Sequence, residues 1–391
     1  MLAVTDADVT RWLADHARPI AEVDDDLDSD GVDAWVRATA GARVVAIGPA
    51  VGGTRELALL ATRLIEASVR AGGVGALALQ AGESATTVLD DHVRHGTGSP
   101  GEALERLGSW SWNTREVLDL VRTLAEDAAV PVVGIDPRRP ANAVRVVGAF
   151  LRTAAPDALP PVADALADLA LGHGDASTRA AVDRVRERLD RDVPALIAAT
   201  SPAQYEEAVR HAEFLARAAE LAATPPARAD SVADRLMADA VIDAAGADGR
   251  VVLWAHADHV VVRGESLGRH LRDRYGDGYR ALVLSAGSGS TRALRRRRLF
   301  GASRTPKVHR FPAAPAASLE GTVLAACPRD SLVDLSQDAP PAAWTGAATT
   351  RRSVGDEVSP AAPARAFVPC VPGSEIDGVA VVSAVRPGWV R

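Results

Sequence analysis

The chain has 391 residues, of which 47% are hydrophobic and 24% charged, a balance typical of a globular protein. Its formal net charge of -7 argues against a general nucleic-acid binder, because phosphate contacts need a basic face. Lys307 is the only lysine, which excludes a Gly-Lys-Ser/Thr phosphate-binding loop, and Cys327 and Cys370 are too few for a disulfide framework.

Nothing in the sequence indicates a membrane or a secreted location. Residues 1–20 are polar and charged at helical spacing, without the basic stretch and apolar core of a secretory signal. No apolar run reaches the roughly 18 residues that a membrane span needs. Together with the two cysteines, these features predict a cytoplasmic protein that binds neither membrane nor nucleic acid.

Helices and strands alternate over the first third of the chain. Short apolar, β-rich runs predict strands at 43–47, 75–79 and 131–135. Amphipathic spacing predicts helices at 5–17, 31–40, 55–71, 84–95, 100–107 and 115–127. The acidic run at 22–30 is expected to be a solvated loop. The alternative, a metal site, has less support because the run lacks the glycine and terminal glutamate of a calcium loop.

The middle of the chain is helical, and the strands return after it. Residues 141–244 show helical patterns, whereas strands are predicted at 251–254, 279–284 and 378–385. The arginine run at 295–298 is expected to be a solvated face. The predicted fold is α/β, with a mainly parallel sheet flanked by helices and a helical insertion that forms a lid over the cleft. Its parts are 1–140, the insertion 141–244, and 245–391.

Polar residues gather where the predicted strands end. In a parallel sheet, ligands bind just beyond the carboxyl ends of the strands. Residues expected at this edge are Pro49, Gly52, Gln80, Glu83, Asp136, His256, His259 and the glycine-rich segment 285–289, which is predicted to be a turn. A small-molecule cleft at this edge is therefore expected.

The two histidines that follow the strand at 251–254 in the sequence are the strongest candidates for catalytic residues. A neutral imidazole can accept or give a proton near pH 7, so His256 and His259 are candidates for general acid and base. The alternative is that they only satisfy local backbone hydrogen bonds. A zinc site has little support, because spacing places no third ligand beside them. A serine nucleophile is not indicated, because no Gly-x-Ser-x-Gly elbow is evident.

The chain contains, in order, VGIDPRR at 133–139, DRLMAD at 234–239, VVLWAHADHV at 251–260 and the following G-x-x-L-R-x-x-x-G-x-x-Y pattern. Taken together, these segments resemble the erythromycin esterase family. The resemblance implies an α/β core with a helical insertion and a deep cleft. It also implies that hydrolytic members open macrolactone esters with an activated water and usually need no metal.

The chain departs from the family pattern at its first turn. The family sequence there is Gly-Glu-x-x-His-Gly, whose histidine is the favoured general base, whereas residues 48–53 read Gly-Pro-Ala-Val-Gly-Gly. Pro49 and Gly52 thus replace a glutamate and the base, and Gln80 replaces a second glutamate. Neither a proline nor a glycine side chain can accept a proton, so water activation by this turn is impossible here.

These observations predict a divergent enzyme of natural-product metabolism that acts on a bulky polyketide or macrolide-type molecule. The expected reaction excludes water: cyclisation, dehydration, isomerisation or acyl transfer to a substrate hydroxyl. The candidate catalytic residues are His256, His259, Asp136 and Glu83. The candidate substrate-binding residues are Gly52, Arg55, Glu56, Gln80, Trp112, Arg138 and Ser285. No cofactor or metal is expected, and the alternatives are a non-catalytic binder and a residual ester hydrolase.

Overall fold

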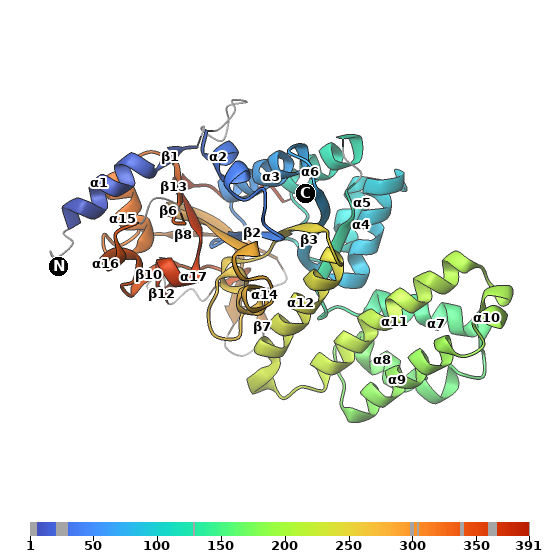
Figure 1. Cartoon of the computed structure of the whole chain (residues 1–391). Helices are drawn as coiled ribbons and strands as arrows, with labels where there is room; N and C mark the ends of the chain where they lie inside the picture. The colour runs from blue at the N-terminus through green and yellow to red at the C-terminus, as the bar shows by residue number, and fades with distance from the viewer. Residues whose placement is uncertain are drawn as a thin grey trace.

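The computed structural model describes residues 6–20, 30–127, 130–297, 301–302, 305–336, 340–358 and 366–390. They form an α/β core with a lobe of helices beside it (Figure 1). The predicted acidic loop at 22–30 lies, apart from Asp30, outside the described residues, as does the end of the arginine run at 298.

Six parallel strands form the centre of the main sheet, in the order β13-β6-β2-β5-β3-β4. Their bounds are β2 Val44–Pro49, β3 Val74–Gly82, β4 Val132–Asp136, β5 Arg250–Trp254, β6 Tyr279–Arg297 and β13 Gly378–Val385. All six coincide with predicted strands, and the mainly parallel α/β prediction is confirmed. β9 (Ser331–Asp334) and β1 (Arg18–Pro19) extend the sheet beyond β13 through antiparallel pairing.

The prediction of a turn at 285–289 is wrong, because β6 continues through these residues. β13 pairs with β6 as far as Gly289, and β8 (Lys307–Phe311) pairs with it from Gly289 onwards. The small residues serve close packing instead. A side chain at Gly287 would collide with Leu324, on α15 (Leu319–Ala326), which packs against this stretch. A glycine-rich sequence that usually indicates a turn is here part of a strand.

The strand residues alternate between the two faces of the sheet, as the pleat requires. On β2, Val45 and Ile47 pack into one core, whereas Val44 and Ala46 pack into the other. Helices that follow the early strands cover the first face: α2 Asp30–Ala38, α3 Arg55–Arg70, α4 Glu83–His95, α5 Pro100–Arg106 and α6 Arg115–Asp127. The second face is covered by α12 Ala229–Ala245, α13 Ala257–Val260 and α14 Leu267–Tyr275, and by α1 Asp6–His16 and α15.

Several short elements lie in the last quarter of the chain. Two strands, β10 (Thr349–Arg352) and β12 (Phe367–Cys370), form a separate antiparallel pair. The others are β7 Gly301–Ala302, β11 Glu357–Val358, α16 Ala342–Thr345 and α17 Pro372–Glu375. β11 pairs with the far end of β6 and thereby holds the preceding residues near the edge of the sheet.

The middle of the chain forms a lobe with its own apolar core (Figure 1). Its helices are α7 Ala141–Ala154, α8 Ala163–Ala170, α9 Ala176–Asp190, α10 Val193–Ala199 and α11 Pro202–Ala222. The next helix, α12, instead packs on the sheet.

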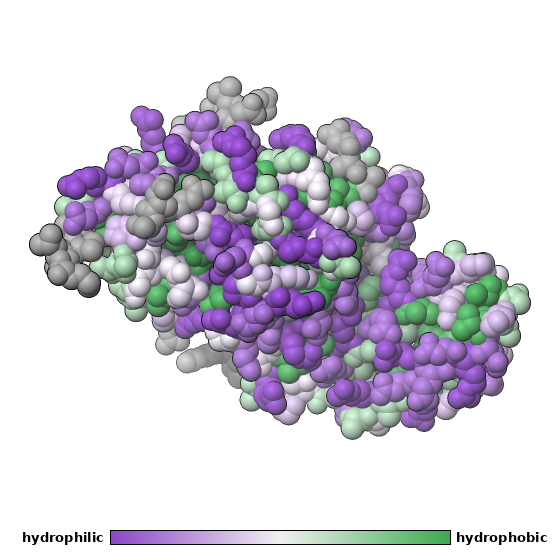
Figure 2. Space-filling view, in the orientation of Figure 1, coloured by the Kyte–Doolittle hydropathy of each residue, from purple (hydrophilic) through white to green (hydrophobic). Residues whose placement is uncertain are grey.

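Hydrophilic residues predominate on the face of the molecule seen in Figure 2. Within the described part of the chain, no helix has both the length and the apolar character that crossing a membrane requires.

Candidate functional site

A cavity of about 600 Å³ opens at the carboxyl ends of β2, β3, β4 and β5. Pro49, Gln80, Asp136 and Trp254, one from each strand end, are part of its lining. Its size falls in the range of sites for small organic ligands. The lining includes Asp234 of α12 but, among the described residues, none from α7–α11. The lid expected from the helical insertion therefore stays a prediction.

Seven of the eleven candidate residues lie in the lining of this cavity. They are His256, His259, Asp136, Gly52, Gln80, Trp112 and Arg138. The other four side chains, those of Glu83, Arg55, Glu56 and Ser285, are not part of the lining. Glu56 accepts hydrogen bonds from the backbone and side chain of Arg386, at 2.6 and 2.7 Å. Ser285 is fully buried in β6 and donates to Glu320 at 2.7 Å.

Glu83 connects the core to the helical lobe. It begins α4 and is buried, and its Oε1 accepts a 2.6 Å hydrogen bond from Nε of Arg217 on α11. Burial raises the pKa of Glu83 from its ordinary 4.5 to about 8, against the lowering effect of Arg217. A carboxyl in this environment retains its proton at a higher pH than in the unfolded chain.

Replacing Glu83 by Gln is therefore expected to change how stability depends on pH. Between pH 4.5 and 8 the native carboxyl holds a proton that the unfolded chain has released, so stability falls as pH rises through this window. One such group contributes a slope of up to about 1.4 kcal/mol per pH unit. Urea denaturation at several pH values would measure it. In the Glu83→Gln variant this component disappears, whereas Glu105→Gln, an exposed change on α5, retains it.

His256 holds the start of α13. Its Nδ1 accepts a 3.2 Å hydrogen bond from the backbone N–H of Asp258, which places the ring proton on Nε2, 3.4 Å from the carbonyl oxygen of Val354. Its own backbone N–H donates to the side-chain oxygen of Gln80 at 2.8 Å. Burial lowers the pKa of His256, and the opposing effect of Asp258 does not restore it. The imidazole is therefore neutral near pH 7.

Asp258 is held by hydrogen bonds from residues near the carboxyl end of the chain. Its carboxylate accepts 2.6 Å hydrogen bonds from Arg351, on β10, and from Ser353. Burial raises the pKa of Asp258, but His256, Arg351 and Ser353 together lower it below its ordinary value. The carboxylate is therefore ionised and already bound by two donors.

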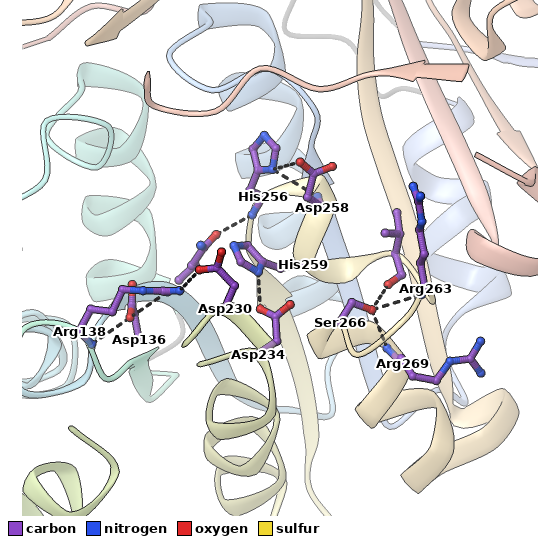
Figure 3. Close-up of polar contacts among 12 residues, drawn as sticks. Asp136, Arg138, Asp230, Asp234, His256, Asp258, His259, Arg263, Ser266 and Arg269 are labelled. Atoms are coloured by element: carbon purple, nitrogen blue, oxygen red, sulfur yellow. Dashed lines mark hydrogen bonds and ion pairs between the residues drawn. The ribbon is translucent and has the colours of Figure 1, made fainter. Parts of the chain in front are cut away.

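His259 forms a dyad with Asp234. Its Nδ1 lies 2.5 Å from Oδ1 of Asp234, which reaches the ring from α12. In Figure 3, each imidazole has its own carboxylate: Asp234 beside His259, and Asp258 beside His256. An ionised carboxylate can only accept, so Nδ1 of His259 carries the proton and Nε2 is the basic nitrogen. This arrangement, in which a carboxylate orients a histidine, is typical of a general base.

A close contact between α14 and α13 positions both histidines. A Cβ at Gly268 would lie 2.1 Å from the carbonyl oxygen of Val260, at the end of α13. The hydroxyl of Tyr279 donates to the same oxygen at 2.5 Å. Gly268 and Tyr279 are the first and last residues of the G-x-x-L-R-x-x-x-G-x-x-Y pattern, which therefore describes how α13, the helix that follows His256 and carries His259, is held.

The cavity has more carboxylates than cations. Its acidic side chains are Glu116, Asp136, Asp230, Asp234, Asp258 and Asp356, against Arg138 and Arg139. Arg138 binds Asp136 and Asp230, at 3.5 and 3.3 Å, as Figure 3 shows. Trp112 donates to the backbone oxygen of Gln80 at 3.1 Å and meets the Trp254 ring edge-on, with 4.9 Å between centroids. Apolar surface is thus combined with a net negative charge.

Sequence reasoning assigned no functional role to Asp230, Asp234 or Asp356, which are acidic residues of the cavity. Asp234 stands first in the DRLMAD segment, which the resemblance had singled out without giving it a role. Asp356 lies in the lining and accepts a 2.9 Å hydrogen bond from Ser111, yet no motif marks it. Among the described residues, no three His, Cys, Asp or Glu side chains are arranged to hold a metal ion.

Comparisons with known proteins agree with this architecture. The model of a family described as erythromycin esterase matches residues 69–385. A Bacillus cereus protein (18% identity, TM-score 0.80) and a succinoglycan biosynthesis protein (15%, 0.79) each share the fold over 100% of both chains. A mutant of the erythromycin esterase EreC in its open conformation is 18% identical, with a TM-score of 0.69 over 95% of this chain and 97% of that one. No curated protein matches. Because the family model spans most of its length, the chain belongs to the erythromycin esterase family.

Proposed function

We propose that this protein is an acid–base enzyme that acts on a bulky polyketide or macrolide-type molecule in natural-product metabolism, with His259 as general base. The observation that carries the proposal is the Asp234–His259 dyad in the lining of the cavity. A neutral imidazole whose tautomer is fixed by a carboxylate can take a proton from a hydroxyl group near pH 7. His256 supplies a further imidazole, which is neutral near pH 7 because burial lowers its pKa, and its ring proton is on Nε2.

The character of the cavity supports this class of substrate. Trp112 and Trp254 offer apolar surface, as binding of a reduced carbon skeleton requires. The excess of carboxylates disfavours anionic ligands such as phosphate esters, because like charges in a cleft repel each other. A neutral or cationic molecule with hydroxyl and ester groups is therefore proposed.

A reaction without water is favoured over hydrolysis. Pro49 and Gly52 offer no group that can transfer a proton, and the side-chain oxygen of Gln80 is bound to the backbone of His256. The proposed acceptor is accordingly a hydroxyl of the substrate, in cyclisation or acyl transfer, or the substrate undergoes dehydration or isomerisation. Hydrolysis is the second candidate, because the same dyad is able to activate a water. A non-catalytic binder is the third.

Mass spectrometry in labelled water tests the proposal. The purified protein would be incubated with a panel of macrolides and linear polyketide esters in H₂¹⁸O. A product of unchanged mass, or one lighter by one water, is expected. A product heavier by one labelled water would instead establish hydrolysis. A panel member that binds but yields no new chromatographic peak would support the binder and sink the enzyme proposal.

A further inference from the structure

Asp356 is held at the cavity by the residues on either side of it. Val354 donates to the carbonyl oxygen of Ala50 at 2.7 Å and accepts from the N–H of Gly52 at 2.8 Å. The carbonyl oxygen of Asp356 itself accepts from Leu294 of β6 at 2.7 Å. The segment therefore pairs with the turn after β2 and with β6 at once, which fixes the backbone from which the Asp356 side chain enters the cavity.

The two carboxyl oxygens of Asp356 have different surroundings. Oδ2 accepts the hydrogen bond from Ser111. Oδ1 lies on the side of Gly52, only 3.0 Å from where a Cβ on that glycine would stand. The carboxyl thus lies next to the place where a side chain at position 52 would enter, which is where the family pattern has its general base. Because Oδ2 is engaged as an acceptor, Oδ1 is the oxygen able to carry a proton.

The environment of Asp356 favours its protonated form. The side chain is exposed to the open cavity, yet the protein packed around its carboxyl raises its pKa above the ordinary value. Glu357 raises the pKa further. Ser111, His256 and Arg139 act in the opposite direction without cancelling the effect of burial. One cavity therefore holds a carboxyl whose pKa is shifted toward the protonated form and the imidazole of His259, and such a difference in environment is how an acid and a base become differentiated.

We propose that Asp356 is a catalytic residue, the proton donor that works with the base His259. This inference rests on the proposed function. In an acyl transfer, His259 Nε2 accepts the proton of the attacking hydroxyl while the new carbon–oxygen bond forms. Asp356 gives its proton to the leaving oxygen as the old carbon–oxygen bond breaks. His259 ends with one proton more and Asp356 with one fewer, and exchange with solvent resets both.

The Asp356→Asn variant tests the inference. An asparagine still accepts the bond from Ser111, so the fold is retained, but it has no acidic proton to give. On the panel member that the wild type converts, turnover is expected to fall about 10²- to 10⁴-fold, with its dissociation constant unchanged in calorimetry. The rate of the wild type falls at high pH as proton donors are lost. The residual rate of the variant is expected to lack this alkaline decline, because the carboxyl that loses its proton is no longer present.

A spectroscopic measurement separates this inference from the proposed function. In protein labelled with ¹³C-aspartate, the carboxyl signal that Asp356→Asn removes is expected to titrate above 3.8, the ordinary value for aspartate. Titration at or below that value overturns the donor role whatever the turnover. Turnover that His259→Ala abolishes and Asp356→Asn leaves intact overturns the inference alone. If the wild type converts nothing on the panel, the proposed function fails and the donor role fails with it.

Discussion

Replacing Asp234 by Asn is expected to lower turnover by about 10³- to 10⁴-fold, the scale of effect when the carboxylate that orients a catalytic histidine becomes an amide. The carboxylate oxygen 2.5 Å from His259 Nδ1 accepts that nitrogen's proton. An amide in its place can donate to Nδ1 and so stabilise the tautomer with the proton on Nε2. The nitrogen that should act as the base is then already protonated.

Asp234 acts through His259, so its test needs a readout beyond activity. Nitrogen-15 NMR of the imidazole is expected to show the proton on Nδ1 in the wild type and on Nε2 in Asp234→Asn. Binding of the converted panel member should be unchanged, so that the loss falls on turnover alone. Asp239→Asn, five residues along the same helix and outside the cavity lining, is the matched control and should behave as wild type. A variant with the altered tautomer and full turnover would remove His259 as the base.

Replacing Gly268 by Ala is expected to cost about 3 kcal/mol of stability, at the upper end of the range for overpacking. Its Cβ would lie 2.1 Å from the carbonyl oxygen of Val260 and 2.7 Å from that of Val261, and both atoms belong to backbone that cannot rotate away. Relief requires α14 to move off α13. Because α13 carries His259, catalysis should suffer together with stability.

Chemical denaturation and turnover would be measured on the same samples. Gly41→Ala is the matched control, because a Cβ there meets nothing within 4 Å, and its stability should stay within about 0.5 kcal/mol of wild type. Wild-type stability in Gly268→Ala would mean that the contact with α13 is not rigid. Lost stability with full turnover would mean that the histidines do not depend on it.

The secondary structure was predictable because its signals are local. The run Val251–Trp254 is apolar and β-rich, and it forms the buried strand β5. The edge of the sheet was predictable for the same reason, since parallel strands bring their carboxyl ends together. This is why His256, His259, Asp136 and Gln80 meet in one cavity. The segment at 285–289 shows where prediction from local patterns fails. Its glycines are needed for close packing against a helix that is distant in the sequence, and no local pattern reveals that contact.

The partners of the site residues were less predictable because they come from remote parts of the chain. Asp234 is 25 positions from His259, and Arg217 is 134 positions from Glu83. Ser111 and Asp356 are separated by 245 positions. An isolated aspartate between two strands has no signature of its own, and its place beside Gly52 depends on pairings at both ends of the segment. The strand ends indicated where a catalytic site is possible, but not which acidic residue would take part in the reaction.

The close approach of Asp356 to Gly52 also couples the two positions. A histidine at position 52 is larger than the single Cβ that already comes within 3.0 Å of the Asp356 carboxyl, so it enters only if that carboxyl swings aside. The two residues therefore compete for the same space, and the benefit of either depends on what occupies the other position. Substitutions at positions 52 and 356 are therefore expected to be coupled, so that the effect of changing both differs from the sum of the two single changes.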